Sequence, residues 1–259
     1  MHLTKIICVR DSPQNKICAT EAIFLGKKLV AIDCLAESSK TYDKKSAVVV
    51  IDVIRSITVA ATAIQSSRRC FFAPSVEAAF TLAKRLDRSL LVGEIGGNMP
   101  FGFDINNSPV EIERRQDIDR PAIIVSSSGI PLLYSLKDNS SVYVACLRNY
   151  GATVNHLAGL YDYIDILGSP TRGEFREEDK LCCALIADGF IKAGYFCKDD
   201  KTLELVNQWK DKPVTVCAEG KSAEYLRKSG QIRDLDFILK HVNDLSLPLA
   251  VKNDEIVKA

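Results

Sequence analysis

Residues 47–58 read AVVVIDVIRSIT, the clearest strand signal in the chain. The first five residues are all apolar and rich in Val, as in strands that a parallel sheet buries on both faces. The next residues include a carboxylate, a guanidinium and a hydroxyl, in Asp52, Arg55 and Ser56. In open α/β sheets, ligands bind beyond the carboxyl ends of the strands. The stretch therefore predicts a buried strand over residues 47–53 that ends at a ligand site.

Similar apolar runs alternate with helical patterns along most of the chain. The other predicted strands are 5–8, 29–34, 69–73, 90–93, 122–126, 141–146 and 164–167. The predicted helices are 75–86, 130–136, 149–160, 177–191, 222–228 and 232–242. Strand–helix alternation predicts a layered α/β fold with a mainly parallel sheet. We expect a single domain over residues 1–259, with a helical C-terminal part over residues 219–259.

Composition excludes several classes of protein. The chain has 259 residues, of which 47% are hydrophobic, and its formal charge is +1. This balance argues against a disordered chain and against a basic nucleic-acid-binding domain. The longest apolar run, residues 181–187, is too short to cross a membrane, and the first residues do not resemble a secretory signal. The nine cysteines are irregularly spaced, which predicts reduced thiols in a cytoplasmic protein. A homo-oligomer remains a possible state of the protein.

Several common catalytic motifs are absent. Gly220-Lys221-Ser222 resembles the end of a P-loop, but Thr215 stands where the first Gly should be. Val125 takes the place of the first Gly of a GxSxG elbow around Ser127. The sequence also lacks a cysteine phosphatase loop, a GxGxxG after a strand and a DxD aspartyl-phosphate motif at Asp52. The three histidines are scattered, which argues against a histidine metal site.

The remaining polar residues favour chemistry with a hard cation and an anion. Oxygen donors follow the predicted strands or begin a helix, and these are Asp52, Glu94, Asp104, Glu174, Glu178 and Asp179. Mg²⁺ is usually held by one or two carboxylates together with water and phosphate oxygens. Arg55 and Arg172 are able to clamp an anion, and Ser127, Ser128 and Gly129 can present backbone N–H groups at a helix start. This combination predicts metal-assisted displacement at phosphorus.

Structural interpretations compete with these functional ones. Acidic residues at 177–179 also complement the dipole of a helix start. Gly96, Gly97 and Gly102 are also typical of a long loop that needs positive φ angles. Residues 107–109 read NSP, which also fits a turn with Pro at the first helical position.

Several short motifs occur in the order found in one known family. They are VVVIDVIRSIT at 48–58, GE at 93–94, GFDINNSP at 102–109, SSSG at 126–129, Asn149, Glu178-Asp179 followed by Ala184, and the segment 230–248. Together they resemble the 2-phosphosulfolactate phosphatase family over roughly residues 45–250. The resemblance implies a three-layer α/β/α fold. It also implies Mg²⁺-dependent hydrolysis of 2-phosphosulfolactate to sulfolactate and phosphate, on a route to coenzyme M.

The resemblance and the charges together suggest a role for each residue. Asp52, Glu94 and Asp179 are expected to hold Mg²⁺. The expected substrate-binding residues are Arg55, Asn107, Ser108, Ser127, Ser128, Gly129, Asn149 and Arg172. The attack is expected to begin with Asp52, with Asp104 or with a water held by the metal. The expected partner is therefore a small anionic phosphorylated substrate, with no nucleic acid and no membrane.

The chain departs from the family pattern in two places. Where the family has TTNGT, residues 126–130 read SSSGI, and we expect this change to alter the substrate pocket. Residues 1–45 are longer than usual and match poorly. One alternative is a catalytically degenerate member that binds a phosphorylated or sulfonated metabolite without converting it. A second alternative is a lyase or transferase that acts on a related phospho-acid.

Overall fold

The structure is a computed structural model that describes residues 26–34, 45–136 and 141–259. The predicted strand over residues 5–8 lies outside these ranges, as do Cys8 and Cys18. Every cysteine within them is a free thiol, as the sequence predicts. No helix in the described part of the chain has the length and apolar character that a bilayer span requires.

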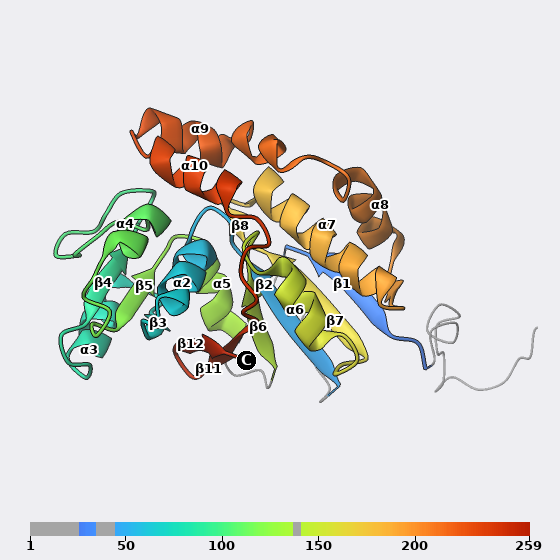
Figure 1. Ribbon diagram of the computed structural model, residues 1–259, viewed down its shortest axis with the longest axis horizontal. Helices are drawn as coiled ribbons and strands as arrows, with labels where there is room; N and C mark the ends of the chain where they lie inside the picture. Colours follow the sequence, from blue (N-terminus) through green and yellow to red (C-terminus); the bar gives the residue numbers. More distant parts are fainter. Residues whose placement is uncertain (1–25, 35–44, 137–140) are drawn as a thin grey trace, which may run out of the picture.

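A large sheet forms the centre of the molecule, with helices on both faces (Figure 1). The strands are β1 (Leu29–Asp33), β2 (Ser46–Ile51), β3 (Cys70–Phe72), β4 (Leu90–Gly93), β5 (Ala122–Val125), β6 (Val142–Ala145), β7 (Tyr163–Gly168), β8 (Pro170–Thr171), β9 (Glu174–Phe175), β10 (Phe196–Cys197), β11 (Leu249–Lys252) and β12 (Glu255–Lys258). The helices are α2 (Ser56–Gln65), α3 (Val76–Ala83), α4 (Pro109–Arg114), α5 (Gly129–Leu136), α6 (Tyr150–Leu157), α7 (Glu177–Lys192), α8 (Asp200–Trp209), the 3₁₀ helix η2 (Val214–Ala218), α9 (Lys221–Lys228) and α10 (Ile232–Lys240).

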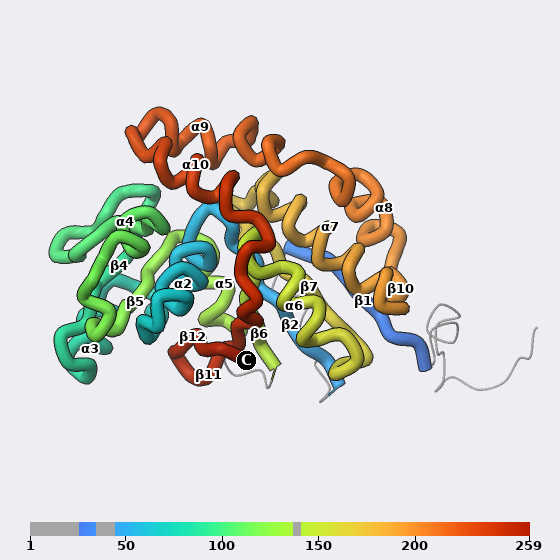
Figure 2. The backbone as a smooth tube through the Cα atoms, viewed as in Figure 1, coloured from blue at the N-terminus to red at the C-terminus, as the bar shows by residue number. Residues whose placement is uncertain are grey.

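The sheet consists of two parallel blocks joined by the C-terminal hairpin. Its order is β10-β1-β7-β2-β6-β11-β12-β3-β5-β4, and the pairs inside each block are parallel. Strands β11 and β12 pair with β6 and β3 in the antiparallel sense. Figure 2 shows the chain running from α10 past the middle of the sheet into this hairpin. The prediction of a mainly parallel sheet is confirmed.

The C-terminal part is not wholly helical, in contrast to the prediction for residues 219–259. Helix α9 ends at Lys228 and α10 at Lys240, and residues 249–258 form the hairpin. The sequence contains a signal for this hairpin, because Asn253-Asp254 separates two short runs with β-branched residues. In the structure Asn253 has the positive φ, +56°, that such a turn needs. The strands are only four residues long, too short for hydrophobic periodicity to show them.

Strand β2 shows why the fold has three layers. Val48 and Val50 pack into the hydrophobic cluster that contains α2 and α5, whereas Val49 and Ile51 pack into the cluster that contains α7. All four side chains are buried, and each such burial stabilises the fold by about 1.5–3 kcal/mol. The three-layer α/β/α fold is therefore confirmed.

The starts of two helices follow the predicted local chemistry. The Ser75 side chain accepts a hydrogen bond from the backbone N–H of Ala78, as expected of an N-cap. Pro109 opens α4, and the side chain of Ser108 caps that helix by accepting from the N–H of Glu111 at 3.1 Å. These caps fix where the loops leave the sheet and enter the helices.

The joining hairpin gives a test of the fold. Ile256 in β12 is 1% exposed and packs into the cluster beneath α2. Ile256→Ala removes buried methyl groups at the seam between the two blocks, and we expect it to lower the free energy of unfolding by about 2–5 kcal/mol. Lys258→Ala, at an exposed position of the same strand, should change it by less than about 0.5 kcal/mol. Urea unfolding measures both, and equal midpoints would show that the hairpin lies outside the cooperative core.

Candidate active site

A cavity of about 490 Å³ lies where β2, β4 and β5 end. Segments far apart in the sequence form its wall, namely the loops after these three strands, the turn between β8 and β9, the residue before α7, and α9. The lining residues are Asp52, Ile54, Arg55, Glu94, Gly96, Gly97, Asn107, Ser127, Ser128, Thr171, Arg172, Arg176, Lys221, Ser222, Glu224, Tyr225 and Leu226. The structure thus brings together many of the polar strand ends that the sequence singles out.

Asp52 is a buried carboxylate in the wall of this cavity. Its Oδ2 accepts a hydrogen bond from Ser56 Oγ at 2.7 Å. Gly129, at the start of α5, lies so close to Asp52 that a Cβ on this glycine would be 2.1 Å from Asp52 Oδ2. The pKa of Asp52 is raised to about 6: burial and, to a smaller extent, the charge of Glu94 raise it, and hydrogen bonds from Ser56 and Gly129 partly offset the rise.

Glu94 is the second carboxylate of the wall, and backbone and hydroxyl donors hold it in place. Its Oε1 accepts from the N–H of Ser127 at 2.7 Å. Its Oε2 accepts from Ser127 Oγ at 3.0 Å and from the N–H of Gly97 at 2.5 Å. Because the donors come from the loops after β4 and β5, folding of these loops fixes the carboxylate in one orientation beside Asp52.

Asp179 does not join these two carboxylates in the wall. Its Oδ1 accepts from the N–H of Val53 at 2.8 Å, and its side chain is buried behind the end of β2. Burial raises the pKa of Asp179 well above its usual range, and the charges of Glu178 and Asp52 raise it further. Burial also raises the pKa of Glu178 to about 7.

The structure does not form the predicted metal site of Asp52, Glu94 and Asp179. In residues 26–34, 45–136 and 141–259, no group of three or more His, Cys, Asp or Glu side chains converges to hold a metal ion. The physical reason is the position of Asp179, whose carboxylate holds the backbone at the end of β2 instead of facing the cavity. Asp52 and Glu94 are the two predicted metal ligands that reach the cavity.

Arg55 lines the cavity, but its charge is already paired. Its Nη1 donates to Asp234 Oδ2 at 2.6 Å and to Gln231 Oε1 at 2.5 Å, and both ionic side chains are 4% exposed. The Ile54–Arg55 peptide bond is cis. The ion pair connects the end of β2 to α10, so Arg55 has a structural partner in addition to its place in the wall.

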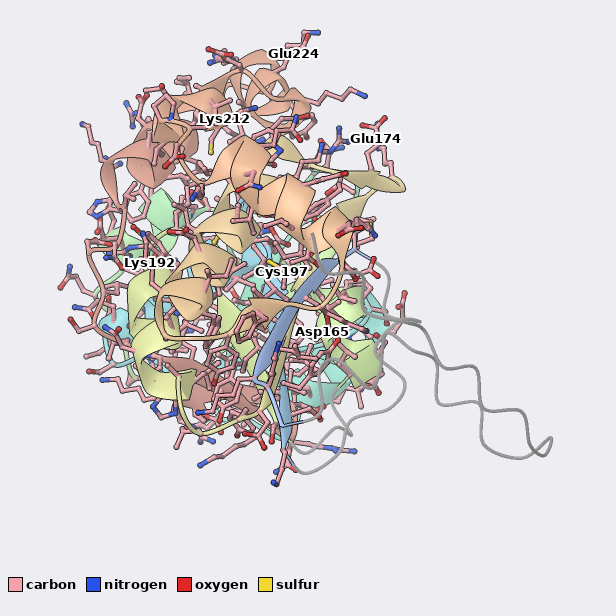
Figure 3. The ribbon with its side chains drawn as sticks, turned by 90° about the vertical axis from the view of Figure 1, so that its right-hand side faces the viewer. Asp165, Glu174, Lys192, Cys197, Lys212 and Glu224 are labelled. Atoms are coloured by element: carbon pink, nitrogen blue, oxygen red, sulfur yellow. The ribbon has the colours of Figure 1, made fainter. Side chains whose placement is uncertain are left out.

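Two further cations of the wall share one carboxylate. Arg176 Nη1 and Lys221 Nζ both lie 2.7 Å from Glu174 Oε2. The hydrogen bond from Lys221 lowers the pKa of Glu174. Figure 3 shows Glu174 on the hairpin that projects from the molecule, at the same end as Glu224 of α9. Arg172, at the turn of this hairpin, has no ion pair within the described residues.

The segment SSSGI contributes to the cavity only in part. Ser127 and Ser128 line it, and Ser128 Oγ accepts a hydrogen bond from Thr171 Oγ1 at 3.2 Å. Ile130 is 0% exposed and packs into the core between α5 and the sheet. The expected change of the substrate pocket at residues 126–130 therefore depends on Ser127 and Ser128, and not on Ile130, whose side chain points into the core.

Asp104 lies away from the cavity and has other partners. Its Oδ2 accepts from the N–H of Leu91 at 2.8 Å, and its Oδ1 pairs with Arg120 Nη2 at 3.0 Å. These contacts fasten the loop after β4 to the strand. The structure therefore gives no support to Asp104 as the group that begins the attack.

Of three further predicted binding residues, only Asn107 lines the cavity. Ser108 caps α4, and its Oγ donates to Asp234 Oδ1 at 2.5 Å. Asn149 is 0% exposed, and its Oδ1 accepts from the N–H of Cys146 at 2.9 Å. Both side chains hold loops and neither lines the cavity, so the structure gives no support to their expected contact with the substrate.

Sequence reasoning missed the contribution of α9 and of Arg176. Lys221 and Ser222 belong to the triplet Gly220-Lys221-Ser222, whose only sequence signal is its likeness to the end of a P-loop. Tyr225 closes the same wall, because a Cβ at Gly97 would lie 2.1 Å from its hydroxyl oxygen. Helix α9 meets the loop after β4 only in the folded chain, so no local pattern could have predicted this contact.

Comparison with known proteins identifies the family of the chain. The family model for 2-phosphosulpholactate phosphatase matches residues 33–252. A probable 2-phosphosulfolactate phosphatase of Deinococcus radiodurans is 27% identical over 80% of this chain and 88% of its own length. The same printed name belongs to a protein of Synechococcus sp. WH7803, 29% identical over 74% of this chain and 80% of that protein.

A protein of the same printed name from Pseudothermotoga lettingae is 30% identical over 53% of this chain, and the match spans 59% of that relative's length. The family model covers far more of the chain than this match and includes both cavity carboxylates, Asp52 and Glu94. The chain therefore belongs to the 2-phosphosulpholactate phosphatase family, a family of phosphoric monoester hydrolases.

Proposed function

We propose that this chain hydrolyses a small phosphomonoester with a further acidic group, 2-phosphosulfolactate or a close analogue, to the free alcohol and inorganic phosphate. A divalent cation, Mg²⁺, takes part. The names of the relatives support the reaction and the substrate. The predicted place on the route to coenzyme M and the predicted cytoplasmic location belong to this proposal.

One observation carries the proposal: a pair of carboxylates and a group of cations face the same cavity. Asp52 and Glu94 lie on the strand ends, whereas Arg172, Arg176 and Lys221 lie on the hairpin, before α7 and on α9. A phosphate ester has both needs at once, since its oxygens bind a metal ion and guanidinium or ammonium groups.

The two carboxylates fit a magnesium ion. Both are oxygen ligands, and Mg²⁺ is commonly held by one or two carboxylates with phosphate and water oxygens completing the shell. Asp52 is buried near the charge of Glu94, an arrangement that disfavours its ionised form and that a bound cation would relieve. When bound, the cation neutralises phosphate charge and makes phosphorus easier to attack.

The residues of the chain supply the remaining steps. Arg172, Arg176 and Lys221 bind the anionic groups of the substrate, and Ser127 and Ser128 can donate hydrogen bonds to phosphate oxygens. Asp52, a carboxylate in the wall of the cavity, accepts a proton from the attacking water. The P–O bond to the alcohol breaks as the new P–O bond forms, and the proton leaves with the alcohol.

Phosphate release from 2-phosphosulfolactate tests the function directly. We expect release with Mg²⁺ and none with a chelator, with sulfolactate as the organic product by mass. Binding without release would favour the degenerate member that only binds its ligand. A product other than sulfolactate would favour a lyase or transferase.

Substitution of the cavity carboxylates should abolish most of the activity. We expect Asp52→Asn and Glu94→Gln each to lower kcat/KM by about 10³-fold or more, since each removes a ligand whose charge the transition state needs. Asp104→Asn is the matched control and should stay within about threefold of the wild type, because Asp104 lies outside the cavity. A large loss in the control, or nearly full activity in Asp52→Asn, would contradict these roles.

The raised pKa of Asp52 also predicts an effect on stability. A carboxyl group whose folded pKa exceeds its unfolded value destabilises the fold increasingly as pH rises from about 4 to about 6, because the folded state disfavours the charge. Asp52→Asn should therefore raise the free energy of unfolding at pH 7.5 by about 1–3 kcal/mol. The gain should vanish near pH 4.

Urea unfolding with a chelator present, at both pH values, measures this difference without metal binding. Equal free energies of unfolding for Asp52→Asn and the wild type at pH 7.5 would mean that folding does not raise the pKa of Asp52.

A further inference from the structure

The cations of the cavity differ in how far their charge is already neutralised. Arg55 has a buried ion pair with Asp234. Arg176 and Lys221 share the carboxylate of Glu174. Arg172 is exposed, and within the described ranges no carboxylate pairs with it. Its guanidinium therefore keeps a full charge for a ligand in the cavity that it lines.

Arg172 stands at the turn of a hairpin that is fastened at both sides. Thr171 pairs with Glu174 across the two strands. The hydroxyl of Thr171 donates to Ser128, in the loop after β5. Glu174 lies 2.7 Å from Lys221, at the start of α9. The hairpin thus connects two walls of the cavity, and Figure 3 shows that the part carrying Glu174 projects from the body of the molecule.

The turn itself does not favour arginine. Arg172 and Gly173 have φ angles of +54° and +77°, as in the two-residue turns where Asn, Asp and Gly are preferred. A long charged side chain gains nothing from this backbone conformation. The charge, which the turn does not need, points to a role in binding.

Arg172 and the carboxylates also belong to different parts of the wall. Asp52 and Glu94 come from the ends of β2 and β4, whereas Arg172 comes from the hairpin between β7 and α7. A substrate whose phosphate lies at the carboxylates and their cation has its other acidic groups left for the cations of the remaining segments. Guanidinium groups bind carboxylate and sulfonate through paired N–H donors.

We propose that Arg172 is the specificity-determining residue for the acidic group of the substrate other than the phosphate, and that Glu174 is the positioning residue that holds the hairpin for it. The proposal rests on the proposed phosphatase function. Arg172 recognises a carboxylate or sulfonate, and Glu174 acts through the hairpin and through Lys221 without touching the substrate.

Four phosphate esters separate this role from general anion binding. 2-Phosphosulfolactate carries a carboxylate and a sulfonate, 2-phospholactate keeps only the carboxylate, 2-phosphoethanesulfonate keeps only the sulfonate, and ethyl phosphate has neither. Arg172→Asn suits the turn and removes the charge. It should lower kcat/KM at least about tenfold, chiefly through KM, for the esters that carry the recognised group. Ethyl phosphate should change by less than about threefold.

The comparison among esters identifies the recognised group. If 2-phospholactate is affected, the group is the carboxylate, and if 2-phosphoethanesulfonate is affected, it is the sulfonate. An equal loss for all four esters, or no loss for any, would overturn the proposal. Arg88→Asn is the matched control, because Arg88 is also an exposed arginine with positive φ and lies outside the cavity.

Glu174→Gln tests the positioning role. It should raise KM for 2-phosphosulfolactate about three- to tenfold with little change in kcat, and Glu174→Asp should recover part of the loss. A fall in kcat with unchanged KM would contradict the role, as would a variant that behaves like the wild type.

A binding measurement keeps the two proposals distinguishable. If the wild type releases phosphate from none of the esters, the phosphatase function fails. Calorimetric titration with sulfolactate, which has no phosphate, then decides the role of Arg172. Binding that is at least about tenfold weaker in Arg172→Asn supports it, whereas equal binding, or no binding to the wild type, overturns it.

Discussion

Burial of the Asp52 carboxylate at the end of β2 is the constraint on which the site depends. The strand is apolar on both faces, so its end opens directly from the core into the cavity. Gly129 must lack a side chain because the carboxylate occupies the space that its Cβ would take. The same close approach sets the start of α5 and brings Ser127 and Ser128 to the cavity. Buried carboxylates with a raised pKa are concentrated at functional sites.

Most of the cationic side chains around the cavity form ion pairs with a neighbouring carboxylate. Asp234 receives Arg55 and Ser108 on its two oxygens, and Glu174 receives Arg176 and Lys221. Each acid therefore joins segments that are distant in sequence. This arrangement explains why residues that resemble a binding motif, such as Ser108, serve to connect α10 to the loop before α4.

The sequence predicts best what is local. The apolar strand and the polar residues after it place Asp52, and the short apolar run at 90–93 places Glu94 at its end. For Asp179, Asp104 and Asn149 the residue types fit the predicted roles, but tertiary partners decide otherwise. A backbone N–H at the end of β2 engages Asp179, Arg120 engages Asp104, and a backbone N–H after β6 engages Asn149. Such competition between partners is invisible without the fold.

The cationic side of the cavity shows the opposite limit. Lys221 and Tyr225 lie more than a hundred residues from Glu94 in the sequence, and α9 is amphipathic like many surface helices. Nothing local marks it as part of a site. Its contribution depends on the packing of Gly97 against Tyr225 and on the contact of Glu174 with Lys221. Carboxylates at the strand ends and cations on the hairpin, before α7 and on α9 thus face one cavity from segments that are distant in the sequence.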